Sequence, residues 1–285
     1  MSTANKADPY YYVPQPSHWP ITGSCALLLM AVGAASWFNS YAMGPWLLLA
    51  GFATLVTMMF GWFGRVIDES GRHLYNKKVD LSFRWGMSWF IFSEVMFFAA
   101  FFGALFYVRN MSVPWLGDME NKLLWPNYTS MWPTNGPYLA DAFTPMSAIG
   151  IPLLNTILLV SSGGTLTIAH HALKAGHRGA LKFWLFVTIV LGFAFLGFQA
   201  YEYTHAYSEL NLKLSTGVYG STFFMLTGFH GFHVTIGAIM LTVMLLRIFR
   251  GHFDAQHHFA FEAAAWYWHF VDVVWLLLFI LVYWL

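Results

Sequence analysis

Charged residues are scarce in this sequence. They make up 9% of the 285 residues, while hydrophobic residues make up 58%. A typical soluble domain has roughly 25% charged residues, so this chain lacks the polar surface that a water-soluble fold needs. An integral membrane protein needs far less, because lipid accepts apolar surface. The net charge of +1 gives no indication of nucleic-acid binding.

Cysteine is represented by Cys25 alone. A single cysteine excludes an internal disulfide, a cysteine-rich metal site and the two-cysteine motif of a binuclear copper centre. The sequence also lacks a glycine-rich phosphate loop, a GxSxG elbow and a CxxCH haem attachment. The polar residues 1–20 do not have the form of a cleaved signal peptide. A chain without a catalytic constellation is better interpreted as part of a larger assembly than as a self-contained enzyme.

Long apolar runs are present instead. A helix needs roughly 20 mostly apolar residues to cross a bilayer, and the sequence contains seven such runs. We therefore predict an all-α membrane protein in which seven helices span the bilayer as a two-helix hairpin followed by a five-helix bundle. The predicted spans are residues 21–43, 46–65, 82–108, 146–171, 181–206, 217–249 and 259–284.

The same runs give a domain division. We predict a polar tail over 1–20, the hairpin over 21–65, a polar connector over 66–81 and the five-helix bundle over 82–285. Within the bundle, residues 109–145 form a long outer loop. Its three tryptophans suit a cap at the membrane surface; they are Trp115, Trp125 and Trp132.

The distribution of lysine and arginine predicts the orientation of the chain. Cytoplasmic loops of membrane proteins carry an excess of these residues. With seven spans, eleven of them fall on one side of the membrane and three on the other. We therefore expect the N-terminus inside and the C-terminus outside. The three on the outer side are Arg109, Lys122 and Lys213.

The predicted span over 82–108 contains a carboxylate near its middle. Glu94 is the only acidic residue in the run from about Leu81 to Val108, and it falls near the middle. A charge at this depth costs several kcal/mol by contested estimates, so such residues usually mark a functional site. We expect burial to favour the protonated carboxyl group, which could donate a hydrogen bond to a neighbour or a lipid.

Other polar residues are predicted at membrane depth in the last three spans. His230 and His233 share a helix face, and His269 and Asp272 can pair at i, i+3. The favoured interpretation is a structural polar network that joins the last three helices by hydrogen bonds. A proton relay and a haem bound by two histidines are the alternatives. The network residues are Glu202, His230, His233, His269 and Asp272.

A second group of histidines is predicted at the inner face, where Glu262 also begins the last span. Clustered histidines can ligate a metal, and the spacing loosely resembles that of membrane desaturases. Because no metal-binding spacing is met, we expect interfacial histidines and no metal site. The histidines are His170, His171, His177, His252, His257 and His258.

Seven stretches are similar to one family. The chain resembles subunit III of haem–copper cytochrome c oxidase from about Trp19 to its end, and the last stretch is the most specific. The stretches are Phe92–Phe98, Pro152–Thr156, Ala169–His171, Gln199–Tyr203, Gly217–Phe224, Thr227–Val234 and His257–Trp275.

The resemblance implies a non-catalytic role in a complex that moves electrons from cytochrome c to dioxygen and pumps protons. It implies packing against subunit I, with subunit II also present, and haem and copper held by those partners only. It also implies support of proton uptake and protection from inactivation during turnover. Glu94 matches the family's intramembrane glutamate, which reacts with a carbodiimide.

The resemblance further implies phospholipid binding. Four residues match family positions near lipid headgroups, although Phe63 stands where mitochondrial members carry tryptophan, beside the matching Trp62. They are Trp62, Glu69, His73 and Arg247.

The length of the loop 109–145 favours a bacterial enzyme in the plasma membrane, with the mitochondrial inner membrane as the alternative. Two other functions stay open at this point: a desaturase-like metalloenzyme that uses the inner histidines, and a proton-coupled transporter with Glu94 and Asp272 as carriers. Transporters often show internal repeats and broken helices, and the sequence shows neither.

Overall fold

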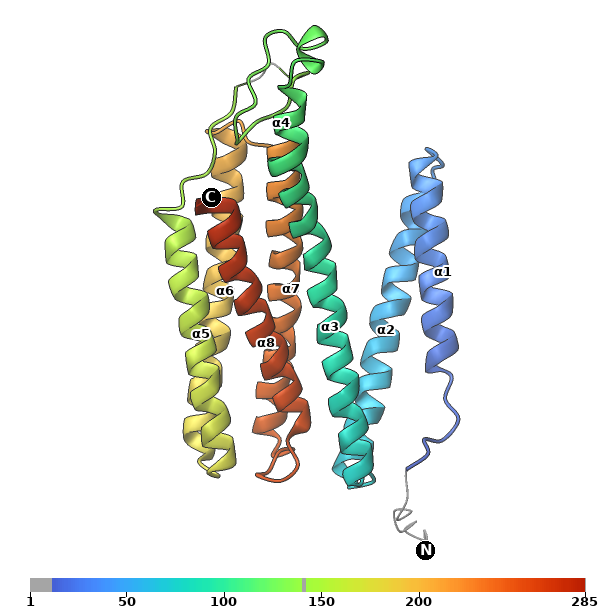
Figure 1. Ribbon diagram of the computed structural model, residues 1–285. Helices are drawn as coiled ribbons and strands as arrows, with labels where there is room; N and C mark the ends of the chain where they lie inside the picture. Colours follow the sequence, from blue (N-terminus) through green and yellow to red (C-terminus); the bar gives the residue numbers. More distant parts are fainter. Residues whose placement is uncertain (1–11, 140–141, 285) are drawn as a thin grey trace, which may run out of the picture. The chain divides into compact units, whose positions relative to one another are not determined.

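The structure, a computed structural model, describes residues 12–139 and 142–284 (Figure 1). Most of the predicted polar tail, two residues of the predicted outer loop and the last residue lie outside this part of the chain. The chain divides into two compact units, Met1–Phe83 and Arg84–Leu285.

The described residues contain seven helices that are long and apolar enough to cross a membrane. The prediction of an all-α membrane protein with seven spans is therefore confirmed, whereas its orientation stays a prediction. The helices are α1 Trp19–Phe38, α2 Gly44–Gly71, α3 Lys77–Tyr107, α5 Ile151–Lys174, α6 Arg178–Ser208, α7 Val218–Phe249 and α8 Phe259–Leu278.

Two of these helices continue as less regular turns. A π-helical turn, η1 (Val108–Ser112), and a short helix, α4 (Val113–Leu116), extend α3. Another π-helical turn, η3 (Phe279–Trp284), extends α8. A 3-10 turn, η2 (Asn121–Leu123), follows in the loop. The segment predicted as a loop from residue 109 is thus helical as far as Leu116.

The helices also extend into the segment 66–81, which we expected to be a polar connector. Only residues 72–76 separate α2 from α3. Ion pairs one turn apart support the polar end of α2, including Arg72 with Asp68 at 2.9 Å. The Asn76 side chain accepts hydrogen bonds from the backbone N–H groups of Lys78 and Val79, which caps the start of α3. Apolar run length missed these turns because they are helical without being apolar.

The first unit is built on the antiparallel pair α1 and α2 (Figure 1). Two glycines let the backbones approach each other. A Cβ on Gly33 would lie 2.5 Å from the backbone nitrogen of Leu48, and one on Gly51 would lie 2.7 Å from the backbone nitrogen of Met30. In lipid, the hydrophobic effect does not favour helix association, so membrane helices commonly associate through small residues that allow close van der Waals packing.

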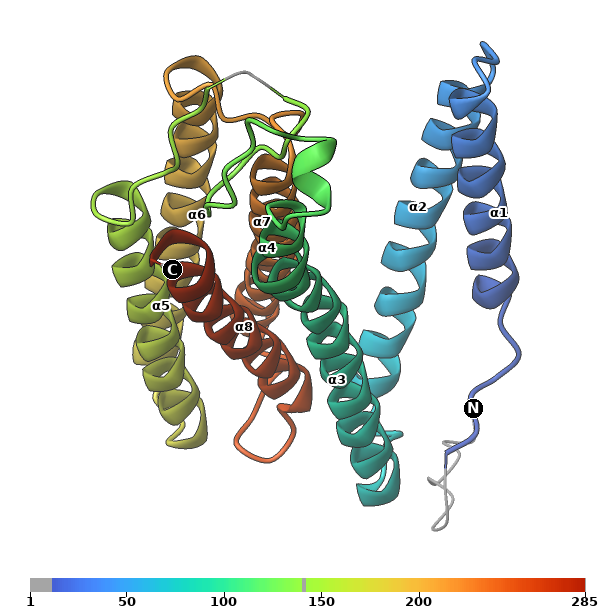
Figure 2. The ribbon, with the colours of Figure 1, turned by 45° about the horizontal axis from the view of Figure 1, so that its top comes forward.

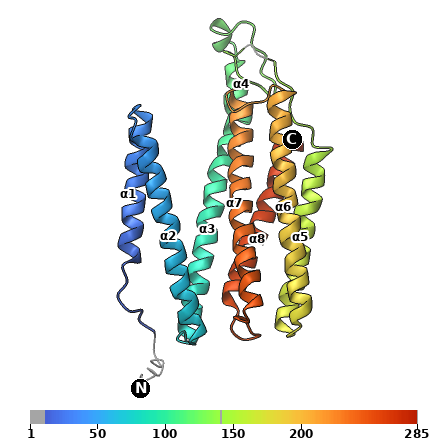
Figure 3. The same ribbon diagram turned by 180° about the vertical axis from the view of Figure 1, so that it is seen from behind.

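In the second unit, α5, α6, α7 and α8 pack in a closed order, each against the next and α8 against α5 (Figures 2 and 3). Helix α3 joins them through aromatic contacts. The ring of Phe97 lies 5.0 Å from that of Phe229 on α7, and Phe98 lies 6.1 Å from Phe270 on α8. Glu94 is carried by the same helix, so this packing sets its surroundings.

Two tryptophans of α8 fill the centre of the second unit. Trp268 and Trp275 are both fully buried. Each indole N–H donates to a hydroxyl group on α5, Trp268 to Ser162 and Trp275 to Thr156, both at 2.9 Å. A buried N–H without a partner would cost about 1–3 kcal/mol, so these bonds fix the position of α8 against α5.

The close approach in the first unit gives a test. Gly33→Ala should destabilise the hairpin by about 1–3 kcal/mol, since overpacking of a tight contact costs this much. Gly64→Ala on α2 is the control, because a Cβ there meets nothing within 4 Å. Unfolding of the purified protein in denaturant measures both. Equal stability of the two variants would contradict the close packing.

Candidate functional site

Glu94 is hydrogen-bonded to His233. Its Oε2 atom lies 2.8 Å from Nε2 of His233, so the bond joins α3 to α7. The side chain of Glu94 is 22% exposed and that of His233 is 9% exposed. The rings of Phe97, Phe98 and Tyr267 lie close to the imidazole. The carboxyl group therefore meets a polar partner in surroundings that are otherwise aromatic.

A second contact of His233 shows which of its ring nitrogens donates a hydrogen bond. Nδ1 of His233 lies 2.6 Å from the carbonyl oxygen of Phe229. A carbonyl oxygen only accepts, so Nδ1 carries a hydrogen and donates it. Either a neutral carboxyl group of Glu94 then donates to Nε2, or an imidazolium Nε2–H donates to a carboxylate. In both forms one proton lies between the two side chains, and the pair is neutral overall.

His230 faces a different neighbour. It is fully buried, and its Nε2–H donates to the carbonyl oxygen of Val271 on α8 at 3.2 Å. Its ring lies 5.1 Å from that of Trp275. The two histidines predicted on one face of α7 thus join that helix to two different helices, α8 and α3.

His269 and Asp272 lie close together, as their spacing predicts. Nδ1 of His269 lies 3.6 Å from Oδ2 of Asp272. The buried carboxyl group lies against Gly163 of α5, where a Cβ would collide with it. Nε2 of His269 lies 3.5 Å from the hydroxyl group of Thr167, also on α5. This group belongs to the α5–α8 contact and is separate from the pair at Glu94.

Glu202 of α6 has a partner at the end of the chain. The hydroxyl group of Tyr283 in η3 donates to its Oε1 atom at 2.6 Å. Both side chains are buried. The bond fixes the last turns of the chain against α6.

The five predicted network residues and Glu94 therefore form separate pairs rather than one connected network. The pairs join α3 to α7, α7 to α8, α5 to α8 and α6 to η3. Sequence reasoning placed the network in the last three helices and missed the bond between Glu94 and His233. The signal was present, because both residues were predicted at the same membrane depth.

Three of the predicted lipid-binding residues lie in the first unit. Trp62 is 45% exposed. Glu69 accepts a hydrogen bond from the hydroxyl group of Tyr75 at 2.8 Å and lies 3.9 Å from Arg65. Burial and this bond raise the pKa of Tyr75. His73 has a left-handed backbone, with φ 55°, at the end of the α2 helix.

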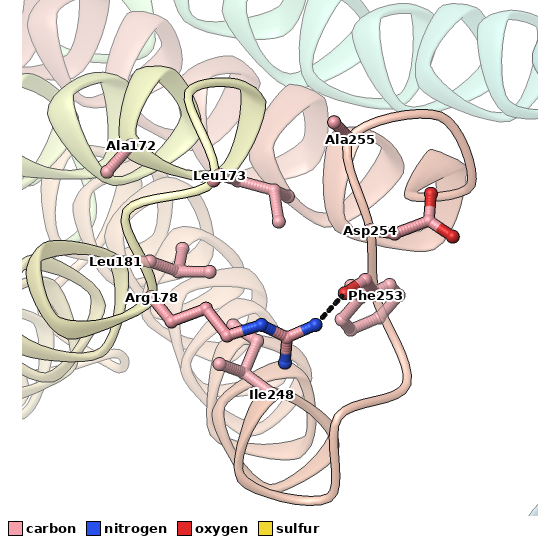
Figure 4. Close-up of a pocket in the computed structure, with 9 residues that line it drawn as sticks. Ala172, Leu173, Arg178, Leu181, Ile248, Phe253, Asp254 and Ala255 are labelled. Carbon is pink, nitrogen blue, oxygen red and sulfur yellow. Dashed lines mark hydrogen bonds between the residues drawn. The ribbon is translucent and has the colours of Figure 1, made fainter.

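Arg247, the fourth predicted lipid residue, lies at one end of the second unit. It is 7% exposed and its guanidinium lies 4.3 Å from the ring centre of Phe253. A small cavity of about 150 Å³ lies near this end (Figure 4). Arg178 lines this cavity, and its guanidinium donates to the carbonyl oxygen of Phe253 at 3.1 Å (Figure 4).

Glu262, at the start of α8, has four basic neighbours. Nη1 of Arg84 donates to its Oε2 atom at 2.6 Å. The other carboxyl oxygen, Oε1, lies 3.3 Å from Nε2 of His258, 3.5 Å from Nε2 of His170 and 4.0 Å from Nζ of Lys174. The sequence predicts the histidines and Glu262 at this face of the membrane. Their contacts with one another and with Arg84 and Lys174 depend on how α3, α5 and the start of α8 pack.

The other inner histidines lie outside this cluster. His257 pairs with Asp254, and His177 precedes α6 as its N-cap residue. Backbone N–H groups of His257 and Gln256 hold the pKa of the Asp254 carboxyl group below its usual range, although partial burial opposes this. His171 and His252 are exposed.

Comparison with known proteins identifies the relatives of this chain. A family profile described as "Cytochrome c oxidase subunit III" matches residues 8–285. The chain belongs to the cytochrome c oxidase subunit III family. It is therefore a subunit of an oxidoreductase complex of the respiratory chain, and its seven apolar helices make it an integral, multi-pass membrane protein.

The similarity to individual members extends over whole chains. "Cytochrome c oxidase subunit 3" of Oryctolagus cuniculus is 44% identical over 277 residues, which cover 96% of both chains. The protein of the same name from Latimeria chalumnae is 44% identical over 284 residues, 99% of this chain and 98% of the relative. That of Marchantia polymorpha is 42% identical over 287 residues, 100% of this chain and 98% of the relative.

A double-mutant cycle tests the bond between Glu94 and His233. We expect the variants Glu94→Ala and His233→Ala to show a coupling of about 0.6–1.7 kcal/mol, the average and maximum for hydrogen bonds between membrane helices. Unfolding free energies of the four proteins give this value. The control cycle combines Glu94→Ala with His269→Ala and should be additive, because His269 faces Asp272. Additivity in both cycles would show that the bond does not form.

Proposed function

We propose that this chain is a non-catalytic subunit of a proton-pumping cytochrome c oxidase, which packs on subunit I, with subunit II also in the complex. In this proposal, haem and copper belong to the partner subunits, and cytochrome c acts on the complex as a whole. Family membership supports the assembly. The proposed location is a bacterial plasma membrane, with the mitochondrial inner membrane as the alternative.

The proposal that the chain supports proton uptake rests on the pair of Glu94 and His233. The carboxyl group is bonded to an imidazole of the same chain, so it does not point freely into a substrate site. The pair holds one proton and can move it between carboxyl and imidazole without gaining net charge. A neutral pair costs far less at membrane depth than an isolated carboxylate. Such a pair suits a residue that holds a proton and stabilises the bundle.

Replacement of Glu94 tests this role in the assembled oxidase. Glu94→Gln keeps a hydrogen-bonding group of similar size, so we expect normal assembly and a normal initial rate of cytochrome c oxidation. Without the exchangeable proton, we expect proton uptake to slow and inactivation during sustained turnover to come several-fold earlier. Glu120→Gln in the exposed loop is the control. Failure of Glu94→Gln to assemble would show a structural role and contradict the proposal.

We also propose that the chain binds phospholipid through Trp62, Glu69, His73 and Arg247. Arg247 supports this most directly. It is a nearly buried cation whose Nε–H has no hydrogen-bond partner in the described part of the chain. An anionic headgroup would supply an acceptor. Each residue contributes within its own unit.

Phosphorus analysis of the purified oxidase tests the lipid proposal. Arg247→Gln should lose bound phospholipid, because it removes the buried charge. Arg250→Gln changes an exposed arginine on the next turn and should keep the lipid content of the parent protein. Equal lipid content in the two variants would contradict a role for Arg247.

A further inference from the structure

The cluster around Glu262 contains three side chains that could ligate one metal ion. His170, His258 and Glu262 each offer one ligand atom, and these atoms lie within 4.8 Å of one another. His170 comes from the last turns of α5, His258 precedes α8, and Glu262 lies one turn into α8. The three residues meet at one end of the bundle.

The distances suit a small divalent ion. Oε1 of Glu262 lies 3.3 Å from Nε2 of His258 and 3.5 Å from Nε2 of His170. Two ligand atoms of a tetrahedral zinc ion, each about 2.05 Å from the metal, lie roughly 3.3 Å apart. The distances from the carboxyl oxygen to the two histidine nitrogens therefore already match the distance between two ligands of a tetrahedral zinc ion. Only the two imidazole nitrogens must move closer to each other.

The imidazole of His258 is oriented as a metal ligand. It is 8% exposed, and its Nδ1–H donates to the carbonyl oxygen of Asp254 at 3.1 Å. In the neutral ring this leaves the lone pair on Nε2, which is buried and makes no hydrogen bond among the described residues. Metal-bound histidines almost always donate their other N–H in this way. Nε2 of His170 is likewise buried without a hydrogen-bond partner there.

The cationic side chains beside Glu262 limit the number of carboxyl oxygens that a metal ion could use. Arg84 occupies Oε2 of Glu262 and leaves Oε1 for the metal. Lys174 lies 4.0 Å from Oε1, but its side chain is 52% exposed and can turn into solvent. Only one carboxyl oxygen is left, so magnesium and calcium, which need several oxygen ligands, fit poorly. Two imidazoles and one carboxylate are a zinc ligand set.

We propose that His170, His258 and Glu262 form a zinc-binding site at this end of the bundle, with water as a fourth ligand. The expectation from sequence spacing was that no metal site exists. Spacing along the chain does not show this site, because its ligands come from α5, from the residue before α8 and from the first turn of α8. Zinc would tie the end of α5 to the start of α8 in place of weak contacts between histidines and one carboxylate. The inference does not depend on the proposed lipid or proton roles.

Adjacent histidines provide matched controls for a binding experiment with zinc chloride. Zinc bound to the chelator-treated intact oxidase is measured by equilibrium dialysis for the parent protein and four variants. Loss of a residue that only hydrogen-bonds to a metal ligand already costs roughly 10–100-fold in metal affinity. His170→Gln and His258→Gln each remove a ligand, so each should weaken zinc binding at this site by at least roughly tenfold. His171→Gln and His257→Gln should bind zinc as the parent does. Equal zinc binding in all five proteins would overturn the proposal.

Two further measurements avoid dependence on one variant. Lys174→Gln should tighten zinc binding several-fold, because it removes a positive charge beside the metal; weaker binding would contradict the site. In the unmodified oxidase, zinc should slow chemical modification of His170, whose side chain is 23% exposed, relative to His171. Equal protection or equal modification of the two histidines would also overturn the proposal.

Discussion

The cost of a polar group in hydrocarbon governs this structure. A carboxyl group or imidazole without a partner costs several kcal/mol at membrane depth. The chain carries several carboxyl groups and imidazoles at this depth. Each described one has a partner from another helix or from its own turn. Glu94 meets His233, His230 meets the backbone of α8, and Tyr283 donates to Glu202. These hydrogen bonds therefore join helices of the second unit to one another.

Packing around α8 makes these bonds possible. Trp268 fills the space beside Gly192 and Gly237, where an added Cβ would lie 2.6 Å and 2.8 Å from its ring. Trp268 and Trp275 also donate to hydroxyl groups of α5. Aromatic packing and hydrogen bonds thus act on the same helix. This packing suits the role proposed for the subunit, because a rigid bundle would hold the proposed proton-bearing pair and the proposed lipid in fixed positions.

Much of the fold could be predicted from the sequence, because crossing a membrane imposes a simple length rule. The seven spans followed from apolar runs alone. The ends of the helices did not, because the polar turns of α2 and α3 are stabilised by ion pairs and by the Asn76 cap. Local pairs such as His269 with Asp272 were predictable from helix spacing. The bond from Glu94 to His233 and the cluster at Glu262 depend on which helices are neighbours, and spacing along the chain does not show that.

The bond between Glu94 and His233 satisfies the intramembrane carboxyl group within its own chain. A high-resolution cryo-electron microscopy map of the intact oxidase that contains this chain tests it directly. We expect the Glu94 carboxyl group to lie within hydrogen-bond distance of Nε2 of His233, while Nδ1 of His233 donates to the carbonyl oxygen of Phe229. A Glu94 side chain that instead contacts a redox centre or another subunit, with His233 bonded elsewhere, would contradict it.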